Sequence, residues 1–272
     1  MRFHAIGGLP RAGSTLLCNL LNQNSKFHAS STSFLPQIIS ILINSFSTNE
    51  EIRSFLIDDK EKTEKVIINC LKGMIDGRYS NECTGKIEVI FDKGRGWGHN
   101  ILSLEKIYPD VRLFVLVRDL RSVLASIEKQ HQKFTLLDPS PTNIDKTLRG
   151  RAINILSSDG IVGAPLNGIT DLITRNRKSV VFIRYEDFTA QTKSVMDMIY
   201  KELDEPVFEH DFNDVKNTST DVDGLYLYKF PHKGNGKIVS PPKEGWRDYV
   251  PQDVADEIIS KFKTYNEYFG YA

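Results

Sequence analysis

Residues 8–17 (GLPRAGSTLL) combine glycines and hydroxyl side chains in a pattern that could bind an anion. Gly8 and Gly13 have the spacing of the P-loop pattern G-x-x-x-x-G-K-[ST], and Thr15 stands at its Ser/Thr position, but Ser14 replaces the lysine. Amides of such a loop and the start of the following helix bind phosphate-like groups. The segment therefore predicts an anion site. The alternative is an ordinary strand–helix turn with a solvated arginine.

Arg11 lies inside this loop and could supply the positive charge that the P-loop pattern takes from lysine. A guanidinium group donates hydrogen bonds in a planar fork, which suits a tetrahedral oxyanion. The sequence also has no obvious carboxylate after an apolar strand of the kind that nucleotide triphosphatases use for Mg²⁺. A nucleotide phosphotransferase is therefore the less favoured interpretation of the loop.

A second candidate site lies in residues 111–126 (VRLFVLVRDLRSVLAS), where Arg118 ends an apolar run and a helical pattern follows. Ser122 and Ser126 are four residues apart, so they lie on one face of the predicted helix. Arg118 and Ser126 could therefore bind one phosphate. Taken alone, an Arg-Asp pair after a strand is more often a helix cap or a surface ion pair.

The order of apolar segments indicates which elements position these residues. Consecutive β-branched and aromatic residues predict strands buried on both faces at 3–6, 87–91, 113–117 and 180–183. Helical patterns occupy 15–22, 35–46, 63–75, 102–107, 123–130 and 254–268. Strands that alternate with helices predict an α/β fold with a doubly wound parallel sheet flanked by helices. Such sheets bind ligands at the carboxyl ends of their strands, so both candidate sites should lie there.

Composition limits the classes of function. Lys+Arg and Asp+Glu both number 35 in 272 residues, so we expect no nucleic-acid partner, and any anion site must be local. The longest apolar stretch, 34–46, is too short and interrupted to span a bilayer, and no signal peptide precedes the first strand. The three cysteines are typical of a reducing compartment. We expect one cytoplasmic domain over 1–272.

Together the two motifs resemble those of the sulfotransferases that use 3′-phosphoadenosine 5′-phosphosulfate (PAPS). P-R-A-G-S-T-L-L resembles their 5′-phosphosulfate loop, and V-R-D-x-R-x-V-x-A-S, about a hundred residues later, resembles their 3′-phosphate motif. The arginine form of the loop is most similar to that of tyrosylprotein-type and bacterial members. Individually weaker similarities follow at 91–97 (FDKGRGW), 183–188 (IRYEDF) and 236–249 (GKIVSPPKEGWRDY).

The resemblance implies a P-loop sulfotransferase fold and transfer of a sulfuryl group from PAPS to a hydroxyl or amine. It implies 3′-phosphoadenosine 5′-phosphate (PAP) as the product and no metal. The residues expected to hold the 5′-phosphosulfate are Arg11, Ala12, Gly13, Ser14 and Thr15. Those expected around the rest of the cofactor are Arg118 and Ser126 at the 3′-phosphate, Tyr185 nearby, and Lys243 and Arg247 in a closing loop at about 213–247. Lys93 is expected to stabilise charge on the bridging oxygen.

The acceptor hydroxyl needs a general base, and here the chain departs from the family pattern. Tyrosylprotein-type enzymes have a glutamate about twenty residues after the loop, where this chain has Ser31 and Thr32. His99 is the preferred substitute, because it follows Lys93 near the place where cytosolic members have a catalytic histidine. His99 could equally be a helix-start residue, and Lys93 a solvated loop lysine. The other candidates for the base are Asp92 and His28.

The acceptor is not specified by the sequence. Helical segments at about 36–75 and 138–176 lie between the cofactor motifs, so we expect them to cover it. They fit a carbohydrate, a lipid, a small molecule or a peptide hydroxyl. Two rival functions stay open. A P-loop kinase would require Mg²⁺, and a protein that binds PAP or PAPS without catalysis would lack a base.

Overall fold

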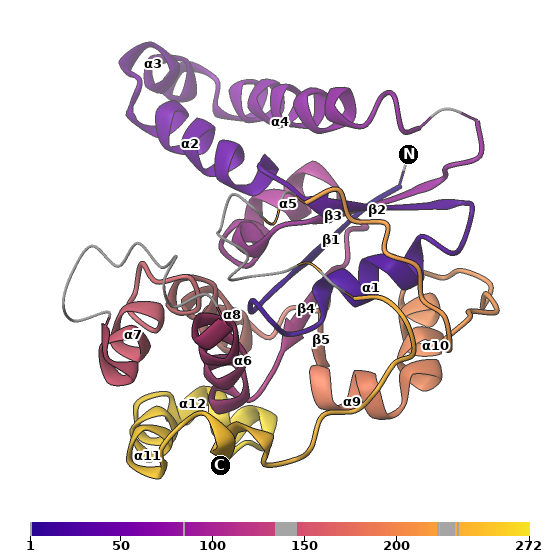
Figure 1. Cartoon of the computed structure of the whole chain (residues 1–272). Coiled ribbons are helices and arrows are strands. Elements are labelled where there is room, and N and C mark those ends of the chain that lie inside the picture. Colours follow the sequence, from indigo (N-terminus) through magenta and orange to yellow (C-terminus); the bar gives the residue numbers. More distant parts are fainter. Residues whose placement is uncertain (1, 84, 134–145, 222, 224–231, 233) are drawn as a thin grey trace.

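The computed structural model describes residues 2–83, 85–133, 146–221, 223, 232 and 234–272, with a parallel β-sheet at the centre (Figure 1). In that part of the chain the sheet has five strands, in the order β2-β3-β1-β4-β5. All neighbouring strands pair in parallel. The strands are β1 (Arg2–Gly8), β2 (Phe27–Thr32), β3 (Val89–Lys93), β4 (Leu113–Val117) and β5 (Val180–Arg184).

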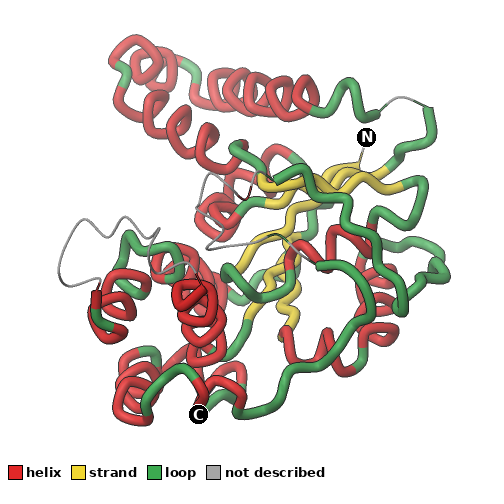
Figure 2. Tube along the Cα trace, in the orientation of Figure 1, coloured by secondary structure: helices red, strands yellow, loops and turns green. Residues whose placement is uncertain are grey.

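Helices lie on both sides of this sheet, with α1 and α10 on one side and α5, α6 and α8 on the other (Figures 1 and 2). The predicted α/β fold, a parallel sheet flanked by helices, is confirmed. The helices before β4 are α1 (Ser14–Leu21), α2 (Leu35–Thr48), α3 (Glu50–Asp58), α4 (Lys60–Arg78), the 3-10 helix η1 (Arg95–Asn100) and α5 (Ile101–Ile107). Those after β4 are α6 (Leu120–Lys133), α7 (Leu148–Ile155), α8 (Gly163–Arg175), α9 (Tyr185–Ala190), α10 (Thr192–Glu202), the 3-10 helix η5 (Gly245–Asp248), α11 (Gln252–Lys261) and α12 (Lys263–Phe269).

The four predicted strands agree with observed ones. The apolar runs of β1, β3 and β4 are buried, whereas β5, at the edge of the sheet, buries only Ile183. β4 has the predicted bounds, and every residue in it is buried. Every residue of β3 is also buried, although β3 begins and ends two residues later than predicted. β1 buries six consecutive residues, from Phe3 to Gly8. Central parallel strands covered by helices on both faces lack polar alternation, which is what the sequence shows here.

β2 was missed by the sequence-based prediction. Its sequence, FHASST, has no apolar run, and as an edge strand it pairs only with β3. Its hydroxyl groups form hydrogen bonds instead of packing: the Lys93 backbone N donates to Ser30 Oγ at 2.9 Å. An edge strand with polar partners has no periodic signature that a hydrophobic pattern could detect.

Two differences among the helices have local causes. Residues 254–268 were predicted as one helix, but α11 and α12 are separated at Phe262, whose φ of −109° and ψ of 42° are not helical. α3 was not predicted, because it buries none of its residues and so lacks an apolar stripe. The Asn49 side chain caps α3 by accepting from Ile52 N at 3.0 Å, and two glutamates occupy its first turn.

A buried carboxylate ties the layer of α4 to the end of β3. Asp92 has no exposed surface, accepts from Tyr79 Oη at 2.5 Å and accepts from Trp97 Nε1 at 2.7 Å. Burial raises the pKa of the Asp92 carboxyl above its usual range. These hydrogen bonds fix the strand end that carries Lys93, the next residue.

Replacing Tyr79 by phenylalanine should lower the free energy of unfolding by about 1–3 kcal/mol, because Asp92 then loses a donor inside the core. Tyr268→Phe is the matched control: Tyr268 is 53% exposed, and its replacement should change stability by less than about 0.5 kcal/mol. Urea denaturation of both variants measures the difference. Equal effects would show that the Tyr79 hydroxyl contributes nothing to the stability of this layer.

Candidate functional site

A cavity of about 440 Å³ lies at the carboxyl ends of the strands. Its walls are the glycine loop after β1, the ends of β2 and β3, Arg118 after β4 and Tyr185 after β5. A loop segment from near the end of the chain, which includes Asp221 and His232, forms the remaining wall. The predicted convergence of the strand-end motifs at one edge of the sheet is confirmed.

The glycine loop has the backbone geometry of an anion cradle. Gly13 has a φ of 92°, directly before the first residue of α1, and a Cβ there would lie 2.8 Å from Tyr185 Cδ2. Only glycine therefore fits both the turn and the approach of the tyrosine ring. Ser14 and Thr15 follow in the first turn of α1 and line the cavity, which places backbone N–H groups and hydroxyls at its floor.

Arg11, Arg118 and Ser126 are in direct contact, although the two motifs are 107 residues apart in sequence. Arg11 Nε donates to Ser126 Oγ at 3.1 Å, and Arg118 Nη1 donates to the Arg11 carbonyl oxygen at 2.7 Å. The Arg118 guanidinium carbon lies 4.3 Å from the centre of the Tyr185 ring, a cation–π contact. The structure thus brings together Arg11, Gly13, Ser14, Thr15, Arg118, Ser126 and Tyr185.

Burial makes these two arginines strong anion ligands. It lowers the pKa of both side chains, and the neighbouring positive charge of Arg118 lowers that of Arg11 further. Arg118 Nε is buried and has no hydrogen-bond partner among the described residues. A buried guanidinium N–H without a partner costs free energy, which a bound anion would remove. Ala12 is fully buried behind the loop and does not line the cavity.

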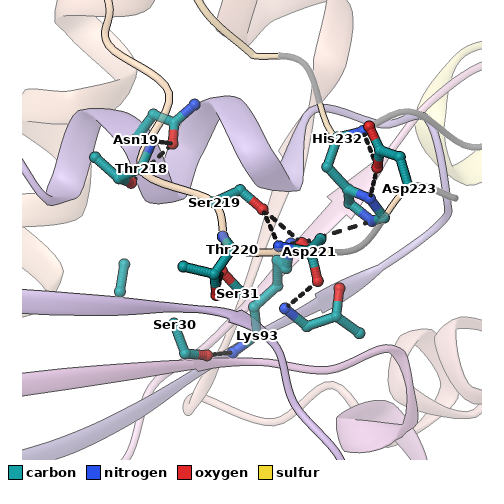
Figure 3. A network of polar contacts seen from close by, with 12 residues as sticks. Asn19, Ser30, Ser31, Lys93, Thr218, Ser219, Thr220, Asp221, Asp223 and His232 are labelled. Atoms are coloured by element: carbon teal, nitrogen blue, oxygen red, sulfur yellow. Dashed lines mark hydrogen bonds and ion pairs between the residues drawn. The ribbon is translucent and has the colours of Figure 1, made fainter. Parts of the chain in front are cut away.

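Lys93 forms a buried ion pair that the sequence did not predict. Its Nζ lies 2.9 Å from Asp221 Oδ2, and the two side chains are 7% and 9% exposed (Figure 3). Asp221 Oδ1 also accepts from Thr32 N at 2.9 Å, and Oδ2 accepts from Ser219 Oγ at 2.7 Å. Burial opposes ionisation of Asp221, but the Lys93 charge and these hydrogen bonds hold the carboxyl pKa well below its usual range. Lys93 is therefore not a solvated loop lysine.

Residues 217–221 dock on α1 and the edge strand β2. Asn19 Oδ1 accepts from both Thr218 N and Thr218 Oγ1 at 2.9 Å. Ser31 Oγ accepts from Thr220 N at 2.7 Å and lies 3.0 Å from Thr220 Oγ1 (Figure 3). The polar residues of β2, which give the strand no apolar pattern that a sequence analysis could detect, are thus the groups that bind residues 217–221. The sequence-based prediction selected basic residues of the loop at 213–247 as site residues, and so it did not include Asp221 or His232.

Ser126 contacts Arg11 without lining the cavity, and His99, Lys243 and Arg247 lie outside it. His99 Nε2 is 2.9 Å from the Ala164 carbonyl oxygen, and its ring packs on Gly168 of α8. Lys243 is exposed, and Arg247 pairs with Glu244 at 3.0 Å on η5, which packs against α6. From the predicted closing loop, the cavity is lined instead by Thr220, Asp221, His232 and Gly234; residues 222, 224–231 and 233 lie outside the described residues.

Neither alternative base from the sequence lines the cavity. The Asp92 oxygens accept hydrogen bonds from Tyr79 and Trp97 inside the core. His28 lies beside the Tyr79 ring, with ring centres 6.0 Å apart, and is not among the residues that line the cavity. The physical reason is strand alternation: Asp92 and Lys93 are adjacent in β3 and point to opposite faces of the sheet.

No helix in the described ranges has the length and apolar character needed to cross a bilayer. Within the same ranges, no three His, Cys, Asp or Glu side chains gather in a group that could hold a metal ion.

Comparison with known proteins agrees with this geometry. The family model described as "Sulfotransferase family" matches residues 5–210. The sulfotransferase domain of the curacin biosynthetic pathway is similar in structure, with a TM-score of 0.52, 15% identity, and 96% of this chain and 97% of that one covered. The sulfotransferase domain of the Synechococcus PCC 7002 olefin synthase has a TM-score of 0.51 and 16% identity, with 94% of each chain covered. The mouse sulfotransferase SULT7A1, complexed with PAP, has a TM-score of 0.52 and 12% identity, with 96% of this chain and 83% of that one covered. At these identities the structures show a shared fold. No curated protein sequence matches significantly.

A double-mutant cycle on Lys93 and Asp221 tests whether the ion pair holds residues 217–221 in place. Lys93→Met and Asp221→Asn should show an interaction energy of about 1–3 kcal/mol in the free energy of unfolding, because each single change leaves a buried partner uncompensated. The exposed pair Lys193 and Asp197, 3.1 Å apart, is the control and should give no more than about 0.5 kcal/mol. Additive effects at Lys93 and Asp221 would contradict the docking role.

Proposed function

Since this chain belongs to the sulfotransferase family, we propose that it transfers a sulfuryl group from PAPS to a hydroxyl or amine acceptor. The observation that carries the proposal is the contact between Arg11, Arg118 and Ser126 at the mouth of the glycine loop. The two partly buried guanidinium groups repel each other, and an anion bound next to both would offset that repulsion. A donor with a 5′-phosphosulfate and a 3′-phosphate has two anionic groups to offer such a site.

Each end of the donor has residues suited to it. The loop amides, Arg11, Ser14 and Thr15 would bind the 5′-phosphosulfate, since they surround the start of α1. Arg118 and Ser126 would bind the 3′-phosphate, and Tyr185 would lie against the nucleotide. PAP is the ligand of the mouse sulfotransferase with the same fold, and we extend that ligand to this chain. Lys243 and Arg247 are not needed for this arrangement, because they lie outside the cavity.

The reaction is an in-line displacement at sulfur. The acceptor oxygen forms a bond to sulfur while the bond from sulfur to the bridging oxygen breaks, and the electron pair stays on the 5′-phosphate of PAP. Lys93 ends β3 and Arg118 follows β4, the two strands that flank β1 and its glycine loop, and the Lys93 ammonium would stabilise the charge that develops on the bridging oxygen. The other contribution of the protein is to hold the reacting groups in line.

The acceptor would enter beside the ends of β2 and β3. Ser31, Thr32 and Arg95 line that part of the cavity, and Ile161, just before α8, lines it from the segment predicted to cover the substrate. Residues 138–145 of that segment lie outside the described residues. α2 approaches the cavity through Pro36, which packs on the lining residue Gly94. We propose that both segments cover the acceptor, whether it is a carbohydrate, a lipid, a small molecule or a peptide hydroxyl.

Arg118→Ala should weaken PAP binding by about tenfold to a hundredfold, because a charge-assisted hydrogen bond contributes about 1.5–3 kcal/mol. Arg149→Ala, which removes an exposed arginine paired with Asp253, is the control and should leave PAP affinity unchanged. Isothermal titration calorimetry measures both. In wild type, PAP should bind more tightly than ATP, with or without added Mg²⁺.

Two results would contradict the proposed donor. One is equal affinity for ATP and PAP, which would favour a nucleotide phosphotransferase. The other is PAP affinity that is unchanged in Arg118→Ala, since that would show that the buried guanidinium does not touch the nucleotide.

A further inference from the structure

The reaction needs a group that removes the acceptor's proton, and the described residues that line the cavity offer few. The titratable side chains among them are Arg11, Lys93, Arg95, Arg118, Tyr185, Asp221 and His232. Arginine, lysine and tyrosine are protonated at neutral pH and cannot accept a proton there. Asp221 and His232 are the two that can, and both belong to the segment that docks beside Ser31 and Thr32.

Asp221 is already committed to other partners. Its Oδ2 accepts from Lys93 Nζ and from Ser219 Oγ, and its Oδ1 accepts from Thr32 N. Those donors stabilise the ionised carboxylate, so it is a weak proton acceptor. Its part is to anchor Lys93 and the chain segment at the end of β2.

His232 has the arrangement of a general base held by a carboxylate. Its Nδ1 lies 2.7 Å from Asp223 Oδ1, and its backbone N donates to the same oxygen at 3.0 Å (Figure 3). Because Asp223 is an acceptor, the ring proton is assigned to Nδ1, which leaves a lone pair on Nε2. Nε2 is 3.7 Å from Asp221 Oδ2, too far for a hydrogen bond. When the ring is neutral, Nε2 therefore keeps a lone pair for another group in the cavity, and when the ring is protonated, Asp221 forms an ion pair with it (Figure 3).

Two described residues near His232, Gly234 and Asp223, interact with the donor site. Gly234 packs so closely on the first turn of α1 that a Cβ there would lie 2.7 Å from Leu16 N. The Gly234 carbonyl oxygen also accepts from Asn19 Nδ2 at 2.8 Å. On the other side, the negative charge of Asp223 acts on Arg11, inside the glycine loop. His232 therefore lines the same cavity as Arg11 and Lys93, and Asp223 and Asp221 connect it electrostatically to both.

We propose that His232 is the general base of this enzyme and that Asp223 positions it, an inference that rests on the proposed function. The acceptor O–H bond breaks as the oxygen attacks sulfur, and its proton passes to His232 Nε2. The bond between sulfur and the bridging oxygen breaks, and its electron pair leaves with PAP. Asp223 stabilises the imidazolium that forms through its bond to Nδ1. A chain segment more than 180 residues after Ser31 and Thr32 thus replaces the missing glutamate.

The test measures PAPS consumption by His232→Ala with two kinds of acceptor. Glycerol, or the water of the buffer, carries a proton that must be removed, whereas 4-nitrophenolate does not. Consumption with glycerol or water should fall about 100- to 10,000-fold, while consumption with 4-nitrophenolate and the Kd for PAP should change less than about threefold. Added imidazole should restore part of the loss.

Further variants separate the base from a structural role. His232→Gln keeps a polar side chain of similar size and should show the same loss as His232→Ala, whereas near wild-type activity of His232→Gln would show that the alanine variant only disturbs the loop. Asp223→Asn should lower kcat with glycerol or water without changing the Kd for PAP, and Asp223→Glu should recover part of it, because only a carboxylate keeps the ring proton on Nδ1. His131→Ala, on α6 outside the cavity, is the matched control and should behave like wild type.

Four outcomes would overturn the proposal. The first is full activity of His232→Ala with glycerol or water, and the second is an equal loss with 4-nitrophenolate. The third is a loss of the same size in His99→Ala with none in His232→Ala. The fourth is PAP binding by a wild-type protein that consumes PAPS no faster than buffer alone. Absence of PAP binding by wild type would instead contradict the proposed function.

Discussion

The contact between the glycine loop and Arg118 is the constraint on which the site depends. Two guanidinium groups, from Arg11 and Arg118, are buried next to each other at the carboxyl ends of β1 and β4. The two side chains repel each other, but contacts with Ser126 and with the Tyr185 ring hold them in position. Such preorganised positive charge, in a chain with no net charge, favours a doubly anionic ligand over a neutral one.

The edge strand β2 binds the segment that brings Asp221 to the cavity. In place of a carboxylate it has Ser31 and Thr32, which bind residues 220 and 221 of the distant segment. This segment brings Asp221 to Lys93 and His232 to the cavity. In the proposed reaction, β2 is thus the strand at which the glycine loop side of the cavity meets the segment that carries the proposed base.

The sequence predicted the parts of the fold and site that depend on local patterns. The strands around Ile6 and Leu116 are continuous apolar runs, and the loop from Arg11 to Thr15 is a contiguous motif. The ion pair between Lys93 and Asp221 joins residues 128 apart, and no spacing rule specifies such a contact. His99 was a reasonable hypothesis from its distance to Lys93, but helix η1 turns it toward α8, a direction set by tertiary packing.

The most direct test of this account is a crystal structure with PAP bound. We expect the 5′-phosphate to accept hydrogen bonds from the backbone amides of Gly13 to Thr15, and the 3′-phosphate to lie within hydrogen-bond distance of Arg118 and Ser126. PAP bound with its 5′-phosphate away from the glycine loop, or with its 3′-phosphate out of reach of Arg118, would contradict the assignment of this cavity as the donor site.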